Sequence, residues 1–194
     1  LPFFFGQLGL NFIFSNIVIW WLLFAMLIAW IYLVEKRTIA SIGWNGLSVK
    51  TAMGGVGLGI LLFLIFGVLN VAIQAIGLEL SQETAQLFAN QPWPVLLLVV
   101  LRAAVVEEVL YRGYAFERIF EFTGSKLLAA LLPLLVFTLA HLSWGVGHLL
   151  FVFIVGGIFA IIYAVKRNLA LLIVAHFTVD VFAIMALPLM LGSQ

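Results

Sequence analysis

The stretch PVLLLVVLRAAVVEEVLYRG, residues 94–113, places two arginines and two adjacent glutamates in a run of apolar side chains. Its length matches the roughly 20 residues that an α-helix needs to cross about 30 Å of hydrocarbon. Charged side chains within such a span cost a few kcal/mol each, so they usually face the interior of a helix bundle. The stretch therefore predicts both a membrane-spanning helix and a polar site inside the bundle.

The composition of the whole chain agrees with this prediction. Of the 194 residues, 65% are hydrophobic and only 9% are charged, which indicates an integral membrane protein. Continuous apolar runs without period-two alternation favour helices over a barrel. We predict an all-α, polytopic transmembrane bundle of about six spanning helices, which forms a single domain over residues 1–194. The expected spans are approximately Gly9–Val34, Gly54–Leu78, Trp93–Arg112, Leu127–Leu142, Gly147–Val165 and Leu169–Leu191.

Several classes of partner and chemistry are excluded by composition. The chain has no cysteine, which excludes disulfides, thiolate metal ligands and a thiol nucleophile. A net charge of +1 without a basic patch does not indicate a nucleic-acid partner. The expected surroundings are the lipid bilayer. The oligomeric state is left open, as is whether an N-terminal segment precedes Leu1, which is not a methionine.

The basic residues predict an orientation through the positive-inside rule. If the spans alternate, eight lysines and arginines fall on one side, which the rule makes cytoplasmic. These eight are Lys36, Arg37, Lys50, Arg112, Arg118, Lys126, Lys166 and Arg167. The loop on the other side carries Glu79 and Glu83 and no basic residue. Both ends of the chain are then expected away from the cytoplasm, and Arg102 is left inside a span.

Spacing predicts which ionisable side chains pair within the spans. Glu108 and Arg112 are four residues apart and share a helix face, so we expect a structural ion pair. Glu107 lies about 100° around the helix and is not neutralised by that pair. Glu107 is therefore the sharper functional candidate. His176 and Asp180 are also four residues apart and can act as a unit.

Histidines on other spans complete the candidate set. Phe137 and His141 share a face, so the two rings can pack together. Three helices that each bring Glu or His inward predict a functional site. His148 is expected to be a loop-end or packing residue, and a supporting role is left open. Counting residues places Glu107 and His176 nearer the cytoplasmic face than His141, by about 10 Å if every span is straight.

The chain resembles the CPBP family, the group of CAAX prenyl proteases and bacteriocin-processing proteins also called Abi. Three motifs carry the resemblance in the expected order: E-E-x-x-x-R at residues 107–112, F-x-x-x-H at 137–141, and H-x-x-x-N or D at 176–180. They lie on three of the last four expected spans. The resemblance covers about residues 93–191.

This resemblance implies an intramembrane endopeptidase that cleaves a membrane-associated, lipidated or leader-containing peptide or protein. It implies that Glu107 is the general base for a water shared with His141. It further implies that His176, with Asp180, stabilises the oxyanion. The glutamate–arginine pair of the first motif is expected to support the helix that presents the base.

Asp180 departs from the family pattern, because the better-studied CAAX proteases carry asparagine there. An ionised aspartate cannot donate a hydrogen bond, so Asp180 must be protonated, orient His176 or help to hold a metal. In the metal alternative, Glu107, His141 and His176 bind Zn²⁺ with water in the fourth position. We prefer the metal-free interpretation, without a cofactor, because no zincin spacing is present.

Two other classes of function stay open. One is a proton- or cation-coupled transporter that uses the same ionisable residues. The absence of an inverted repeat weighs against it. The other is a non-proteolytic peptide-binding immunity protein, against which the intact set of motifs argues. No residue decides which peptide or protein is the substrate.

Overall fold

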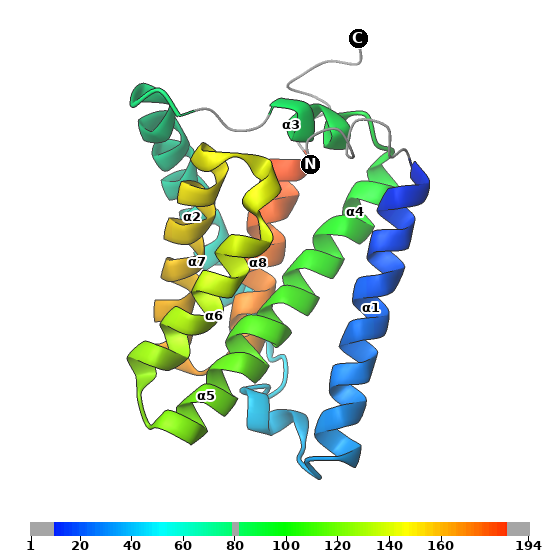
Figure 1. Cartoon of the computed structure of the whole chain (residues 1–194), viewed down its shortest axis with the longest axis vertical. Helices are drawn as coiled ribbons and strands as arrows, with labels where there is room; N and C mark the ends of the chain where they lie inside the picture. Colours follow the sequence, from blue (N-terminus) through cyan, green and yellow to red (C-terminus); the bar gives the residue numbers. More distant parts are fainter. Residues whose placement is uncertain (1–9, 79–81, 186–194) are drawn as a thin grey trace.

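The computed structural model describes residues 10–78 and 82–185, and these ranges contain helices and no strand. The predicted all-α class is thus confirmed. Successive long helices run up and down through a bundle (Figure 1). They include α1 (Leu10–Leu33), α2 (Val49–Ala75), α6 (Lys126–Ala140), α7 (Val146–Lys166) and α8 (Leu169–Ile184). Gly9, Leu191, both chain ends and the side chains of Glu79 and Glu83 lie outside the described part.

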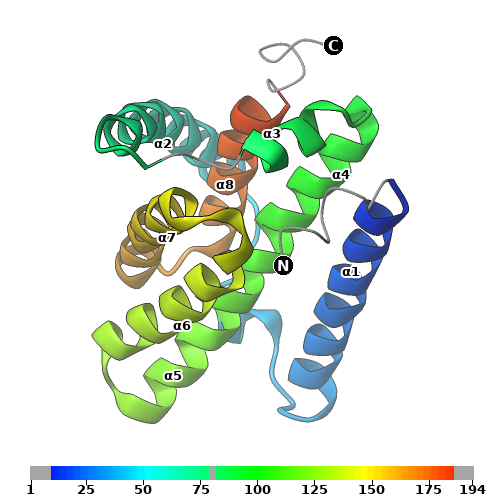
Figure 2. The same cartoon turned by 45° about the horizontal axis from the view of Figure 1, so that its top comes forward.

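The expected third span is one continuous, tilted helix built from three segments (Figures 1 and 2). It consists of α4 (Trp93–Arg102), η3 (Ala103–Ala115) and α5 (Phe116–Thr123). The backbone stays right-handed helical at both junctions. The helix continues past its expected end at Arg112 because Phe116 is buried in the core. Gly124 ends it with a φ of 67°, a conformation that favours glycine.

The middle segment, η3, is a π-helix of 13 residues. Hydrogen bonds in a π-helix run from residue i to i+5, and most known examples are single turns, often at functional sites. Side chains five residues apart therefore lie on the same side of this segment. Nothing in the sequence marks the change of period.

Three helices are long and apolar enough to cross a membrane by length and composition, namely α1, α2 and α7. α6 and α8 are apolar but shorter. The total of six spans stays a prediction. The loop expected between the second and third spans contains a short helix, α3 (Gln82–Ala89), because Leu87 and Phe88 pack on apolar side chains of α1 and α4.

α8 lies at the centre of the bundle and packs closely against α2. A Cβ atom at Gly55 would lie 2.6 Å from Cβ of Val174, and one at Gly59 would lie 2.5 Å from Cβ of Thr178. Small residues spaced by four let two helices in a membrane approach each other closely. α2 is outside the motif region, yet it holds the helix that carries the third motif.

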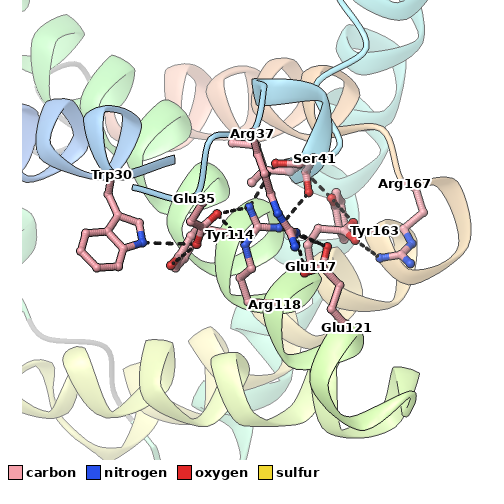
Figure 3. A network of polar contacts seen from close by, with 11 residues as sticks. Trp30, Glu35, Arg37, Ser41, Tyr114, Glu117, Arg118, Glu121, Tyr163 and Arg167 are labelled. Carbon is pink, nitrogen blue, oxygen red and sulfur yellow. Dashed lines mark hydrogen bonds and ion pairs between the residues drawn. The ribbon is translucent and has the colours of Figure 1, made fainter. Parts of the chain in front are cut away.

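Polar side chains close the end of the bundle where α1 leads into α2, and we call them the end network (Figure 3). Arg118 of α5 lies 2.5 Å from the carboxylate of Glu35 and donates to the carbonyl of Ser41 at 3.3 Å. Arg37 forms a 2.6 Å ion pair with Glu121. These contacts fix the connection that holds the short helix η2 (Ile39–Ile42) against α5.

The α7–α8 connection joins the same network (Figure 3). Arg167 and Glu117 form a 2.6 Å ion pair, and the hydroxyl of Tyr163 donates to Glu117 at 2.7 Å. The Tyr163 hydroxyl also lies 3.1 Å from the carbonyl of Ile42. Of the eight basic residues assigned to one side, Arg112 alone has its guanidinium buried inside the bundle. Which side of the membrane this end faces stays a prediction.

Candidate active site

Glu108 is the best-buried charged side chain among the described residues, with 0% of its surface exposed. Its Oε1 atom accepts from Nη1 of Arg112 at 3.0 Å and lies 2.8 Å from Nδ1 of His176. Arg112 also donates to the carbonyl of Gly156 on α7 at 3.2 Å. A buried charge is tolerated only when it is paired and hydrogen-bonded. Glu108 thus ties η3 to α8 directly and to α7 through Arg112.

His176 lies between two carboxylates. Its Nδ1 atom faces Glu108, and its Nε2 atom is 3.4 Å from Oδ2 of Asp180, four residues along α8. Because a carboxylate can only accept, the Nδ1 atom carries a proton. Glu108 therefore orients the imidazole, and Nε2 faces the carboxylate of Asp180 at the longer distance. The ring also packs on Phe159, with centroids 5.5 Å apart.

Glu107 has a partner that the sequence analysis did not assign. Its Oε1 atom lies 2.7 Å from Nη1 of Arg102, and 13% and 14% of the two side chains are exposed. In an α-helix, side chains five residues apart differ by about 140°. The π-helical hydrogen bonding of η3 brings them together instead. The sequence did contain a signal for this pair, because Arg102 is a basic residue inside an expected span and no role was assigned to it.

His141 lies at the end of α6, one turn after Phe137. Its Nδ1 atom is 2.8 Å from the carbonyl of Phe137, and the two rings pack with centroids 4.8 Å apart. A carbonyl can only accept, so this contact places the proton on Nδ1. The Nε2 atom is then an acceptor that can bind a water molecule.

The expected difference in depth between His141 and Glu107 is absorbed by the packing of α6 against η3. Tyr111 and Phe137 pack with ring centroids 5.0 Å apart, and Arg112 lies over the Phe137 ring at 4.6 Å. The two helices run in opposite directions (Figure 1). Glu107 lies about one turn from Tyr111, and His141 lies about one turn from Phe137. Both steps run in the same direction along the bundle. This packing places the two candidates at a similar level along the bundle.

His148 of α7 lies beside His141, with ring centroids 5.9 Å apart. The aromatic ring of Trp144 lies beside both, with centroids 5.7 Å from His141 and 4.5 Å from His148. Trp144 belongs to the short helix η4 (Leu142–Trp144), and it also contacts Phe88 of α3 at 6.0 Å. His148 is therefore a neighbour of the site within an aromatic cluster.

The zinc alternative requires Glu107, His141 and His176 to converge on one ion. Within residues 10–78 and 82–185, no three histidine, aspartate or glutamate side chains are arranged to hold a metal ion. Four contacts between ionisable side chains do form. Two of them join a carboxylate to an arginine, and two join a carboxylate to a nitrogen of His176. The arrangement does not fit a zinc site, and we derive no chemical step from a metal.

Carboxylates and histidines presented by three apolar helices are the residue types that an intramembrane hydrolase would use. Residues 89–182 match the family model described as type II CAAX prenyl endopeptidase, Rce1-like. This segment runs from the end of α3 into α8, and over it the chain is similar to the Rce1-like CAAX endopeptidases. No curated protein and no solved structure matches the chain.

Proposed function

We propose that this integral membrane protein is an endopeptidase, which activates water with Glu107 and cleaves a membrane-associated peptide or protein. The observation that carries this proposal is the contrast between adjacent carboxylates. Glu108 is fully buried and its Oε1 binds two partners, whereas Glu107 is partly exposed and binds one. Of the two, Glu107 is the carboxylate that a substrate and a water molecule can reach.

In the proposed reaction, Nε2 of His141 accepts a hydrogen bond from the water while Glu107 removes a proton from it. The water oxygen adds to the scissile carbonyl carbon. His176 acts as an imidazolium between Glu108 and Asp180, with Nδ1–H held by Glu108, and its Nε2–H donates to the oxyanion. The C–N bond then breaks, and the proton on Glu107 passes to the leaving amine. Asp180 keeps the imidazole in place, and no metal ion is required.

The substrate is expected to be lipidated or to contain a leader segment. It would approach from the bilayer, since the site lies inside an apolar bundle. We further infer that the end network faces the cytoplasm, because seven basic residues lie in or beside the loops at that end.

Glu107→Gln tests the proposal. The purified protein, reconstituted in liposomes, would receive three internally quenched peptides: a farnesylated CAAX peptide, its unmodified form and a leader peptide. We expect the wild type to cleave at least one peptide. The variant should be about 10²–10⁴-fold slower, because it lacks the general base. Its thermal unfolding temperature, followed by tryptophan fluorescence, should be lowered less than that of Glu108→Gln, since glutamine keeps the shape of the side chain and the Arg102 pair is partly exposed.

The control is a proton-flux measurement on the same liposomes. A transporter would move protons in a manner sensitive to Glu107→Gln and would cleave nothing. A peptide-binding protein would retain peptides without cleaving them. Full cleavage by Glu107→Gln would show that Glu107 is not the base.

A further inference from the structure

We propose that Arg102 is a positioning residue for Glu107, and that Trp20 of α1 holds Arg102 in that role. This inference rests on the proposed function, because Glu107 must act on a substrate for its position to matter. Arg102 was left without a role by the motifs, which begin at Glu107.

The ion pair between Arg102 and Glu107 carries the first step. Nη1 of Arg102 lies 2.7 Å from Oε1 of Glu107, and both side chains are largely buried. An ion pair is stronger at low effective dielectric constant than in water, and a charge-assisted hydrogen bond also fixes direction. Among the described residues, only Oε1 of Glu107 is engaged. Arg102 thus fixes the carboxylate and leaves Oε2 to take the proton.

Trp20 carries the second step. A long arginine side chain near a span end commonly extends toward the membrane surface. Here the Cζ atom of Arg102 lies 5.8 Å from the centre of the Trp20 ring, within the range of a cation–π interaction. The guanidinium is therefore held from two sides, by the indole of α1 and by the carboxylate that the π-helix brings close.

The consequence concerns α1, which precedes the family segment at residues 89–182. α1 packs mainly against α4 and η3, the segments that carry Arg102 and Glu107. Most of its other side chains are exposed. A helix outside the motif region therefore contributes to the position of the base.

Two substitutions of Arg102 test its role, with the panel peptide that the wild type cleaves fastest as the probe. We expect Arg102→Gln to lower kcat about 10–100-fold at nearly constant KM, because the base is misplaced while substrate contacts stay. Arg102→Lys keeps the charge and should recover most of kcat. A purely structural role would lower the unfolding temperature of Arg102→Gln and the amount of folded protein instead.

Trp20 has a matched control in its neighbour Trp21, whose ring packs on Phe24 at 5.4 Å. We expect Trp20→Leu to lower kcat several-fold and Trp20→Phe to retain it, since phenylalanine keeps a ring for the cation. Trp21→Leu should leave kcat unchanged. Equal kcat values for Trp20→Leu and Trp21→Leu would overturn the role of α1.

The outcomes separate this inference from the proposed function. A wild-type kcat for Arg102→Gln, together with an inactive Glu107→Gln, would overturn the inference alone. Cleavage by Glu107→Gln would overturn both. A raised KM at constant kcat would assign Arg102 to substrate binding and also overturn the positioning role. If Arg102→Gln does not fold, the kcat values of Arg102→Lys, Trp20→Leu and Trp20→Phe test the positioning role instead.

Discussion

Arg112 inside the bundle and Arg118 in the end network each hold a glutamate, but they differ in burial and in number of partners. Side-chain exposure is 5% for Arg112 and 0% for its partner Glu108. For Arg118 and Glu35 it is 17% each. Arg118 also reaches Ser41, which is 77 residues away in sequence.

The comparison shows two uses of the same ion pair. Inside the bundle, a stranded charge has no water to replace its partner, so each contact is needed for folding. At the end, water can solvate a released charge, so each pair is worth less. The end network mainly fixes the connection between α1 and α2, whereas the interior pairs orient the groups of the site.

The largest effect on stability is expected from Glu108→Gln. The change leaves Arg112 without a counter-charge, which should lower the free energy of unfolding by about 3–5 kcal/mol. Thermal unfolding and the yield of folded protein measure it. The double variant Glu108→Leu with Arg112→Met removes both charges, so its free energy of unfolding should fall less than that of Glu108→Gln. An unfolding temperature for Glu108→Gln equal to that of the wild type would contradict the structural role.

A substitution at Gly59 should have the next largest effect. The added methyl group of Gly59→Ala would lie 2.5 Å from Cβ of Thr178 and 2.7 Å from the carbonyl of Ala175, so α8 must move. We expect a loss of about 1–3 kcal/mol, together with reduced cleavage.

Gly57 provides the matched control on the same helix. A Cβ atom at Gly57 has no heavy atom within 4 Å, so Gly57→Ala should be as stable as the wild type. Equal losses for the two variants would show that the helix tolerates neither substitution, and that close packing on α8 is not the reason.

Substitution of Glu35 should have a smaller effect on stability, and this effect should depend on pH. Hydrogen bonds from Arg118 lower the pKa of the Glu35 carboxyl below its ordinary value of 4.5. Its stabilising contribution is therefore complete above pH 4.5 and is lost as the pH falls through the lowered value. At neutral pH, we expect Glu35→Gln to cost about 1 kcal/mol or less. The difference from the wild type should shrink in acid, and a difference that grows there would refute the assignment.

The smallest effect is expected from Arg37→Gln. Arg37 and Glu121 are each 43% exposed, so water and salt screen the pair. We expect a loss of stability smaller than that of Glu35→Gln, and one that diminishes further in high salt. Unfolding temperatures at two salt concentrations measure it. A loss as large as that of Glu108→Gln would remove the distinction between the two regions.

Much of the architecture could be predicted because it depends on local properties of the chain. Apolar runs of sufficient length indicate membrane helices, and breaks between them follow from polar and glycine-rich segments. The ion pair of Glu108 with Arg112 and the contact of His176 with Asp180 follow from a spacing of four residues. The catalytic roles assigned through the motifs stay predictions.

By itself, the sequence determined the helical class, the three motif segments and the pairs within one helical turn, because helical periodicity sets which near neighbours share a face. Tertiary structure decided that Glu108 meets His176, since that contact depends on how η3 and α8 rotate against each other. It also decided that Glu107 meets Arg102. That pair forms where the backbone changes to the five-residue hydrogen bonding of a π-helix, and no residue pattern predicts this change.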